Sequence, residues 1–254
     1  MQTKSWALGF VFGIATLASA GTVPVTTCGQ FVGSGDVGVL QADLLCPPSG
    51  VGVSLDPNAG LQLNGHRISG AMIGVYTHAG RTDIQGPGVI RDAVEVGVYA
   101  PNNEGRHTVR IHGDVDLKGH GISAISLGQS NKVNLQLTDV HIEDNPGTTL
   151  GQCNGIKLRA ANVEVLRNGG GICGDAIRLD RVDIQDNQGA GIFSWRATAR
   201  LRDTIVTGHT PYDIETTRRP RLMGSSSCGL SVQLPPFPDF PAPGAPSWSV
   251  CSGD

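Results

Sequence analysis

The chain has 254 residues, and its formal net charge of −3 at pH 7 shows no basic excess, which argues against a nucleic-acid partner. Its 36 glycines and its charged fraction of 16% favour many tight turns and short strands, here taken as a single domain. Aromatic residues make up only 5%, which is low for the core of a β-sandwich or a closed barrel.

Residues 1–20 have the pattern of a secretory signal peptide. Lys4 supplies the positive charge, residues 6–17 form an apolar core, and the Ala-Ser-Ala of residues 18–20 is a small-x-small cleavage site. The apolar run is short for a membrane span. The sequence therefore predicts cleavage after Ala20, a secreted, periplasmic or cell-surface location, and no membrane span once the signal is removed.

The rest of the chain is predicted to have three parts. Residues 21–50 cap the start of a repeat body, because the open end of such a body exposes core and unpaired strand edges. Residues 51–217 form the repeat body itself. Residues 218–254 are rich in proline and form a wrapping tail that caps the far end.

Six cysteines fall in three neighbouring pairs, and an even number in an exported chain favours disulfides. We expect the sequential pairing, because each bond then closes a local loop or a terminus. The expected bonds join Cys28 to Cys46, Cys153 to Cys173, and Cys228 to Cys251. The chain has no Cys-x-x-Cys and no paired-histidine spacing, so no metal site is predicted.

One short pattern recurs along the repeat body. Residues 140–145, 163–168 and 182–187 each alternate aliphatic and polar residues and stop at Asn, while residues 204–209 are a degraded copy that stops at His. The first three copies start 23 and 19 residues apart. A period of about 20 residues with one alternating strand per copy indicates a solenoid.

Residues 61–70 (LQLNGHRISG) and 82–91 (TDIQGPGVIR) resemble coils of the right-handed parallel β-helix superfamily, the pectate-lyase-like proteins. The resemblance covers roughly residues 50–217. It implies an all-β, single-stranded right-handed parallel β-helix. The repeat period gives about seven or eight coils, and the cysteine pairs at the two ends predict disulfide-tied terminal caps. Because the superfamily includes lyases, hydrolases, epimerases and adhesins, the resemblance specifies a fold and not an activity.

In such a β-helix, alternate side chains of each strand point into the cylinder and stack on the coil below. The predicted inside set is aliphatic: Val53, Leu55, Leu63, Val75, Ile84, Val98, Ile111, Leu117, Ile122, Leu137, Ile142, Ile156, Leu158, Val165, Ile177, Leu179, Ile184 and Ile192. Asn145, Asn168 and Asn187 recur at one strand end, which favours a structural turn ladder of stacked amides over a polar binding row.

The residues that follow the inside positions are expected to point outward on one flat face. They form two rows, of which the first is Tyr76, Tyr99, Ser123, Lys157, Arg178 and Phe193, and the second is His78, Arg159, Asp180 and Trp195. Aromatic rings cover sugar rings and arginine binds carboxylates, so this face suits an acidic polysaccharide or a surface glycan. The expected substrate-binding residues are Tyr76, Tyr99, Arg159, Phe193 and Trp195. The alternative is an ordinary solvated face with scattered aromatic residues.

The resemblance also implies what chemistry this face would carry. Lyases of the superfamily remove the proton beside a uronate carboxylate, using Arg or Lys as the base and a cation such as Ca²⁺ on the carboxylate. The catalytic candidates are Lys157, Arg178, Asp180 and His78, with Lys157 or Arg178 as the base. No cofactor is certain, and Ca²⁺ stays open because Asp180, Asp183 and Asp186 are near each other in the sequence.

Two functions therefore stay open. One is a secreted carbohydrate-active protein that binds an acidic polysaccharide or cleaves it by lyase-like β-elimination, as the aromatic and basic residues favour. The other is a non-catalytic secreted or cell-surface scaffold. The lack of a catalytic signature of the superfamily, such as the Asp pairs of its hydrolases, favours this second function.

Overall fold

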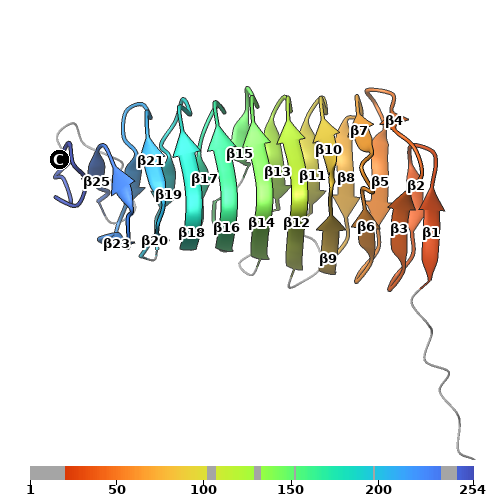
Figure 1. Ribbon diagram of the computed structural model, residues 1–254, viewed down its shortest axis with the longest axis horizontal. Coiled ribbons are helices and arrows are strands. Elements are labelled where there is room, and N and C mark those ends of the chain that lie inside the picture. Colours follow the sequence, from red (N-terminus) through yellow and green to blue (C-terminus); the bar gives the residue numbers. More distant parts are fainter. Residues whose placement is uncertain (1–20, 102–106, 129–132, 152, 197, 236–244) are drawn as a thin grey trace, which may run out of the picture.

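The computed structural model describes residues 21–101, 107–128, 133–151, 153–196, 198–235 and 245–254, so the predicted signal peptide lies outside the described residues. These residues are all-β without a helix, and they wind into a right-handed parallel β-solenoid of about 8 turns (Figure 1). The predicted fold class is confirmed. Within this part of the chain, no helix is long and apolar enough to cross a membrane.

Each turn of the solenoid contributes strands to three faces. A 15-stranded parallel sheet covers two adjacent faces, which we call face 1 and face 2. Face 1 follows the path β1 (Thr22–Val25), β3 (Val37–Leu40), β6 (Gly60–Gln62), β9 (Gly80–Gln85), β12 (His107–Lys118), β14 (Val133–Glu143), β16 (Ile156–Leu166), β18 (Ala176–Gln185), β20 (Arg200–Arg202) and β23 (Arg221–Met223). Face 2 contains β4 (Leu44–Leu45), β7 (Arg67–Ser69), β10 (Gly88–Arg91), the second halves of β12, β14, β16 and β18, then β21 (Ile205–Thr207) and β24 (Ser227–Cys228).

Two smaller parallel sheets form face 3. The first has six strands: β2 (Gln30–Val32), β5 (Val51–Leu55), β8 (Ile73–Thr77), β11 (Val96–Ala100), β13 (Ser123–Leu127) and β15 (Thr148–Leu150). The second has four strands: β17 (Ile172–Cys173), β19 (Ile192–Ser194), β22 (Ile214–Thr216) and β25 (Ser231–Gln233). A single parallel bridge between Thr148 and Gly170 links them.

Strands β14, β16 and β18 pass from face 1 to face 2 without a break. They turn at one residue of positive φ, which is Asp139 (54°), Asn162 (53°) or Arg181 (53°). Asp and Asn enter this left-handed region more readily than most other side chains. Strand β12 turns instead through two residues, Gly113 and Asp114, and this extra residue is a β-bulge that shifts its register against β14.

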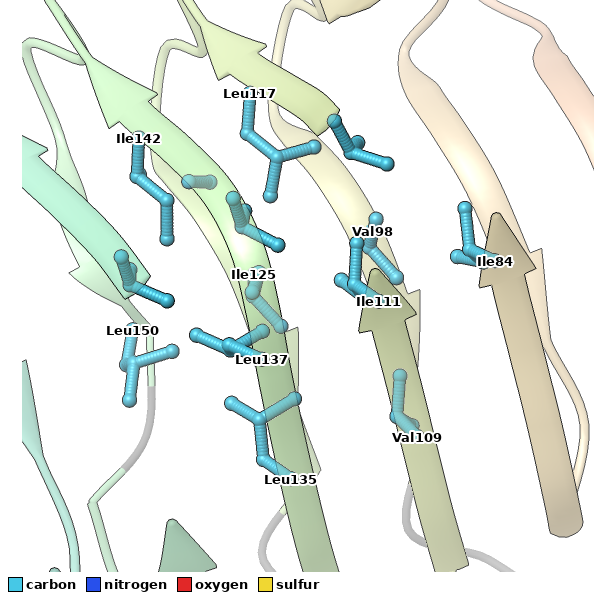
Figure 2. Close-up of a cluster of buried hydrophobic side chains, with 14 of the residues drawn as sticks. Ile84, Val98, Val109, Ile111, Leu117, Ile125, Leu135, Leu137, Ile142 and Leu150 are labelled. Carbon is cyan, nitrogen blue, oxygen red and sulfur yellow. The ribbon is translucent and has the colours of Figure 1, made fainter. Parts of the chain in front are cut away.

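Aliphatic side chains stack along the inside of the solenoid, as Figure 2 shows for Val98, Ile111 and Leu137. Every residue of the predicted inside set is buried except Ile122, which is 57% exposed. The outward position predicted for Ser123 was also wrong, because Ser123 is fully buried. Ser123 pairs in register with Val96, so the alternation in this coil starts one residue later than the sequence pattern suggested.

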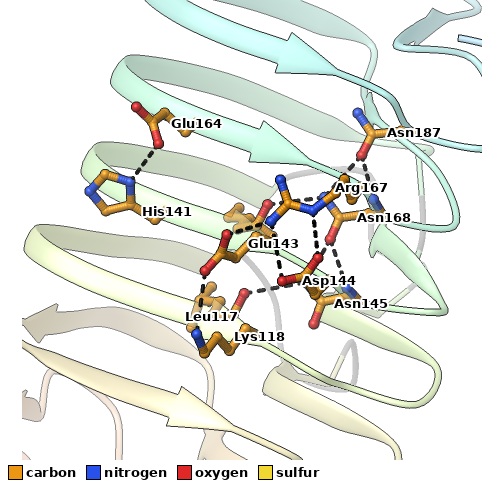
Figure 3. A network of polar contacts seen from close by, with 11 residues as sticks. Leu117, Lys118, His141, Glu143, Asp144, Asn145, Glu164, Arg167, Asn168 and Asn187 are labelled. Carbon is orange, nitrogen blue, oxygen red and sulfur yellow. Dashed lines mark hydrogen bonds and ion pairs between the residues drawn. The ribbon is translucent and has the colours of Figure 1, made fainter. Parts of the chain in front are cut away.

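The predicted asparagine ladder is confirmed, and its members are buried inside the solenoid (Figure 3). The Asn145 Nδ2 donates to Asn168 Oδ1 (2.7 Å), and the Asn168 Nδ2 donates to Asn187 Oδ1 (3.0 Å). The same oxygens accept the backbone N–H of Asn145 (3.1 Å) and of Asn168 (2.8 Å). On the other side, Asn145 Oδ1 accepts the backbone N–H of the buried His120 (2.8 Å). Because these side-chain amides are buried and hydrogen-bond one another, they do not form a binding row.

The ladder continues to the last turns through His209. The Asn187 Nδ2 donates to His209 Nε2 (3.0 Å), which leaves the proton on Nδ1 to donate to Asp213 Oδ1 (2.8 Å). The second oxygen of Asp213 accepts the backbone N–H groups of Gly229 (2.7 Å) and Leu230 (2.8 Å). One line of hydrogen bonds thus joins the middle of the solenoid to its end.

All three predicted disulfides are formed: Cys28–Cys46, Cys153–Cys173 and Cys228–Cys251. Strand pairing extends past both boundaries predicted for the repeat body. Strand β2 pairs with β5 before residue 51, and β25 pairs with β22 after residue 217. In the tail, Trp248 Nε1 donates to the carbonyl of Thr216 (3.2 Å), while residues 236–244 lie outside the described residues.

Candidate functional site

The residues predicted to share one outward face lie on two faces of the solenoid. Lys157 and Arg159 of β16 and Arg178 and Asp180 of β18 lie on face 1. Face 3 carries the others: Tyr76 of β8 with His78 just after it, Tyr99 of β11, and Phe193 of β19 with Trp195 just after it. The expectation of one flat face was therefore wrong, because β16 and β18 belong to the 15-stranded sheet while β8 and β11 do not.

Four arginines follow one another along face 1, and we call them the arginine row. Arg159 pairs in register with Arg178, Arg178 with Arg200, and Arg200 with Arg221. Neighbouring strands place these side chains about 4.8 Å apart along the solenoid axis. All four are exposed, and in the described part of the chain none of them forms an ion pair.

An open groove of ≈ 340 Å³ runs over Arg159, Arg178 and Arg200 of this row. Its lining residues are Arg159, Ala160, Arg178, Leu179, Asp180, Arg200, Arg202 and Met223. Asp180 is the carboxylate among these lining residues, and its Oδ1 lies 2.9 Å from Nη1 of Arg181. Lys157 is exposed two residues before Arg159 on the same strand, which extends the positive charge beyond the groove.

Face 3 carries two separate aromatic clusters. The Tyr76 ring lies 5.0 Å from His78 in an edge contact and 5.7 Å from Tyr99. In the four-stranded sheet, Phe193 and Trp195 meet edge to face at 4.9 Å. Such rings offer surfaces for sugar rings, but each cluster belongs to its own sheet and not to the groove on face 1.

Glu215 was not anticipated from the sequence. It pairs in register with Phe193, and burial raises the pKa of its carboxyl group. A carboxyl group beside an aromatic pair is a further polar group that a sugar could contact. Its sequence context, a single Glu in a short strand, gave no signal by which it could have been selected.

Face 2 carries a row of acidic residues and one histidine. Asp116, His141, Glu164 and Asp183 pair in register on successive coils. Burial raises the pKa of Asp116, the nearby His141 opposes this rise, and the Asp114 carboxylate adds to it. These side chains lie on the other side of the corner from the arginine row, so the two rows carry opposite charge.

An ion-pair network borders this acidic row (Figure 3). Arg167 Nε lies 2.7 Å from Asp144 Oδ1 and Arg167 Nη2 lies 2.9 Å from Glu143 Oε2. The Arg167 hydrogen bond lowers the pKa of Asp144. Lys118 Nζ approaches Glu143 Oε1 at 3.4 Å. Unlike the arginine row, these cations are already paired with carboxylates.

The three aspartates considered for calcium from the sequence do not converge. Asp180 lies on face 1, Asp183 lies on face 2, and Asp186 occupies the next corner with a φ of 53°. Calcium needs several oxygens around one point, and strand alternation with the bend in β18 separates these three.

Comparison with known proteins identifies no relative: no family model, no curated protein and no solved structure matches this chain. What the geometry establishes is a parallel β-solenoid with a row of arginines on one face, none of which has an ion-pair partner among the residues that the structure describes.

Proposed function

We propose that this protein is a secreted carbohydrate-active β-helix protein that binds an acidic polysaccharide along the arginine row. The observation that carries the proposal is the register of Arg159, Arg178, Arg200 and Arg221 on successive coils without an ion-pair partner in the described part of the chain. A linear polyanion lying parallel to the solenoid axis would meet one guanidinium per coil.

The energetics of the row support an anionic ligand. Like charges directly opposite each other on neighbouring strands are destabilising, by about 1 kcal/mol per pair in water at such distances. A carboxylate bound between two guanidinium groups removes this repulsion and accepts paired hydrogen bonds from each planar fork. The row is therefore better suited to a bound polyanion than to solvent alone.

Binding is better supported than cleavage. Hydrolysis of a glycosidic bond generally uses two carboxyl groups, and Asp180 is the carboxylate that lines the groove. A lyase-like β-elimination would instead use Lys157 or Arg178 as the base, with Ca²⁺ as an added cation. His78 lies on face 3 and would take no part in a reaction on the arginine row.

The binding proposal is tested by isothermal titration with a polyuronate and with a neutral polysaccharide of similar length. The double variant Arg159→Ala/Arg178→Ala is expected to bind the polyuronate about tenfold or more weakly, since a hydrogen bond to a charged group contributes about 1.5–3 kcal/mol. Its matched control is Arg67→Ala/Arg91→Ala, which removes the same charge from face 2, where both arginines are paired with aspartates. Equal loss of affinity in the two double variants would contradict the arginine row as the binding surface.

The same polymers distinguish a lyase from a binding protein. Absorbance of an unsaturated uronate product is followed with and without Ca²⁺. A rise that disappears in Lys157→Ala or Arg178→Ala would establish β-elimination at this face. A flat trace together with tight polyuronate binding supports the non-catalytic binding protein. Neither product nor binding would favour the structural scaffold.

A further inference from the structure

We propose that face 2 carries a binding site for a divalent transition-metal ion of the zinc type, with Asp114, Asp116 and His141 as its protein ligands. The site lies around the corner from the arginine row, so it does not depend on the function proposed above. Its ligands come from two successive coils, with both aspartates on β12 and the histidine on β14.

The ligand atoms are close enough for one ion. An oxygen of each aspartate and a nitrogen of His141 all lie within 4.8 Å of one another. Zinc binds N and O ligands at about 2.0–2.2 Å in tetrahedral geometry, which puts ligand atoms about 3.4 Å apart. The Asp114 side chain is 74% exposed, so it can close the difference by rotating toward the other two ligands.

The β-bulge in β12 puts the second carboxylate beside the first. In regular register, Asp116 faces His141 on the next coil. The bulge adds Gly113 and Asp114 opposite the single residue Asp139 of β14, and the Asp114 Oδ1 thereby comes to 3.7 Å from His141 Nε2. Bulges of this kind redirect side chains, and here the redirected side chain meets the imidazole.

His141 is oriented like a metal ligand. Its Nδ1 lies 3.0 Å from Glu164 Oε2 on the following coil, so Nδ1 carries the proton and donates it to the carboxylate (Figure 3). Nε2 is then unprotonated and lies 3.7 Å from Asp114 Oδ1, and this nitrogen forms no hydrogen bond within the described residues. A carboxylate that holds the far nitrogen of a ligating histidine is the usual outer partner of zinc-bound imidazole.

His112 on β12 is a histidine whose Nε2 is not free to bind a metal. His112 has nearly the same side-chain exposure as His141, 38% against 39%, and also lies beside an aspartate. Its Nε2, however, lies 2.6 Å from Asp83 Oδ1, which is direct hydrogen-bond distance and occupies the nitrogen. His112 is therefore a matched histidine that the proposal predicts to be irrelevant to metal binding.

The choice of metal follows from the ligand types. One imidazole nitrogen with two carboxylate oxygens suits zinc and its neighbours in the transition series, whereas calcium prefers six to eight oxygens. Three protein ligands leave a fourth position for water, as in open zinc sites.

The test is a calorimetric titration of the tag-free, disulfide-intact protein with Zn²⁺ at pH 7. The absorption spectrum of the Co²⁺-loaded protein gives a second readout, because it reports tetrahedral coordination. We expect one ion per chain. His141→Ala and Asp116→Asn should abolish binding, and Glu164→Gln, which keeps a side chain on the far nitrogen, should weaken it by about 10–100-fold. His112→Ala should bind zinc like the original protein, and millimolar Ca²⁺ should not compete.

Asp114→Asn keeps the proposal testable if a variant in the sheet fails to fold. Asp114 is largely exposed at a φ of 67°, and Asn tolerates that conformation, so the coil should persist while a charged ligand is lost. The proposal is overturned if zinc does not bind, if Asp114→Asn and His141→Ala bind it unchanged, or if His112→Ala lowers affinity as much as His141→Ala.

Discussion

Replacement of Asn168 by alanine tests whether the buried amide ladder holds neighbouring coils together. The Asn168 side chain takes part in four hydrogen bonds. Its Nδ2 donates to Asn187 Oδ1 (3.0 Å) and to the carbonyl of Ile142 (3.0 Å), and its Oδ1 accepts the backbone N–H (3.1 Å) and the Nδ2 (2.7 Å) of Asn145. Asn168 is 1% exposed, so water cannot replace these partners without opening the coil.

The magnitude follows from which groups lose their partners. The backbone N–H of Asn145 is left buried without an acceptor in the described residues, which costs about 1–3 kcal/mol. The other three hydrogen bonds contribute about 1 kcal/mol each, because their remaining atoms keep other partners such as the carbonyl of Leu117. We therefore expect Asn168→Ala to lower the free energy of unfolding by about 4–6 kcal/mol.

The assay is urea unfolding followed by circular dichroism, with the free energy obtained by linear extrapolation. Asn134→Ala is the control, because Asn134 is a half-buried asparagine of β14 on face 1 and lies outside the ladder. The control should change stability by no more than about 0.5 kcal/mol. Hydrogen exchange at the Asn145 amide should accelerate in Asn168→Ala alone. If both variants unfold at the same urea concentration, the ladder does not stabilise the solenoid and the reasoning above fails.

Two further predictions concern stability. Burial lowers the pKa of His120 to about 4, so the unfolded chain takes up a proton at this residue below pH 6.5 while the folded chain does not. The contribution of His120 to the free energy of unfolding is complete above pH 6.5 and falls by up to about 3 kcal/mol as the pH drops toward 4. His120→Asn should reduce this decrease. If the urea midpoint changes equally between pH 7 and pH 4.5 in the variant and the parent protein, the prediction fails. Cys153→Ser/Cys173→Ser opens a disulfide between residues 20 apart and should cost about 3 kcal/mol by chain entropy, which thermal melting of the variant and of the chemically reduced parent protein should both reveal.

The fold could be predicted because its sequence signals are local and repeated. The copies that end at Asn145, Asn168 and Asn187 specify a strand, an inside set and a corner, and in the solenoid each of these lies against its equivalent one coil away. The wrong prediction that Ile122 points inside has a local cause as well. His120 takes the inside position at the preceding corner, so the strand alternation resumes at Ser123, and a count of aliphatic residues cannot detect that shift.

The candidate site could be predicted only in part. Lys157, Arg159 and Arg178 were selected as a basic surface, and they do lie together. Their grouping with Tyr76 was wrong because the sheet that contains Tyr76 continues after β13 with β15, whereas β16 begins face 1. A short aliphatic strand after a glycine occurs on both faces, so the pattern does not say which face a strand joins. The extension of the row to Arg200 depends on which residues of β18 pair with β20. That register is set by how the coils stack on one another and cannot be read from the sequence pattern.

The ladder also shows where this chain can change length. Successive ladder residues from His120 to His209 are separated by 25, 23, 19 and 22 residues, yet each reaches the next with a hydrogen bond. The differences must be taken up at the other corners of each coil, since the ladder corner keeps the same geometry. An inserted peptide placed between β15 and β16 would leave the axis of the solenoid undisturbed, whereas one placed beside Asn168 would interrupt it. The ladder thus acts as a fixed spine, and the opposite corners are where new loops can be grafted.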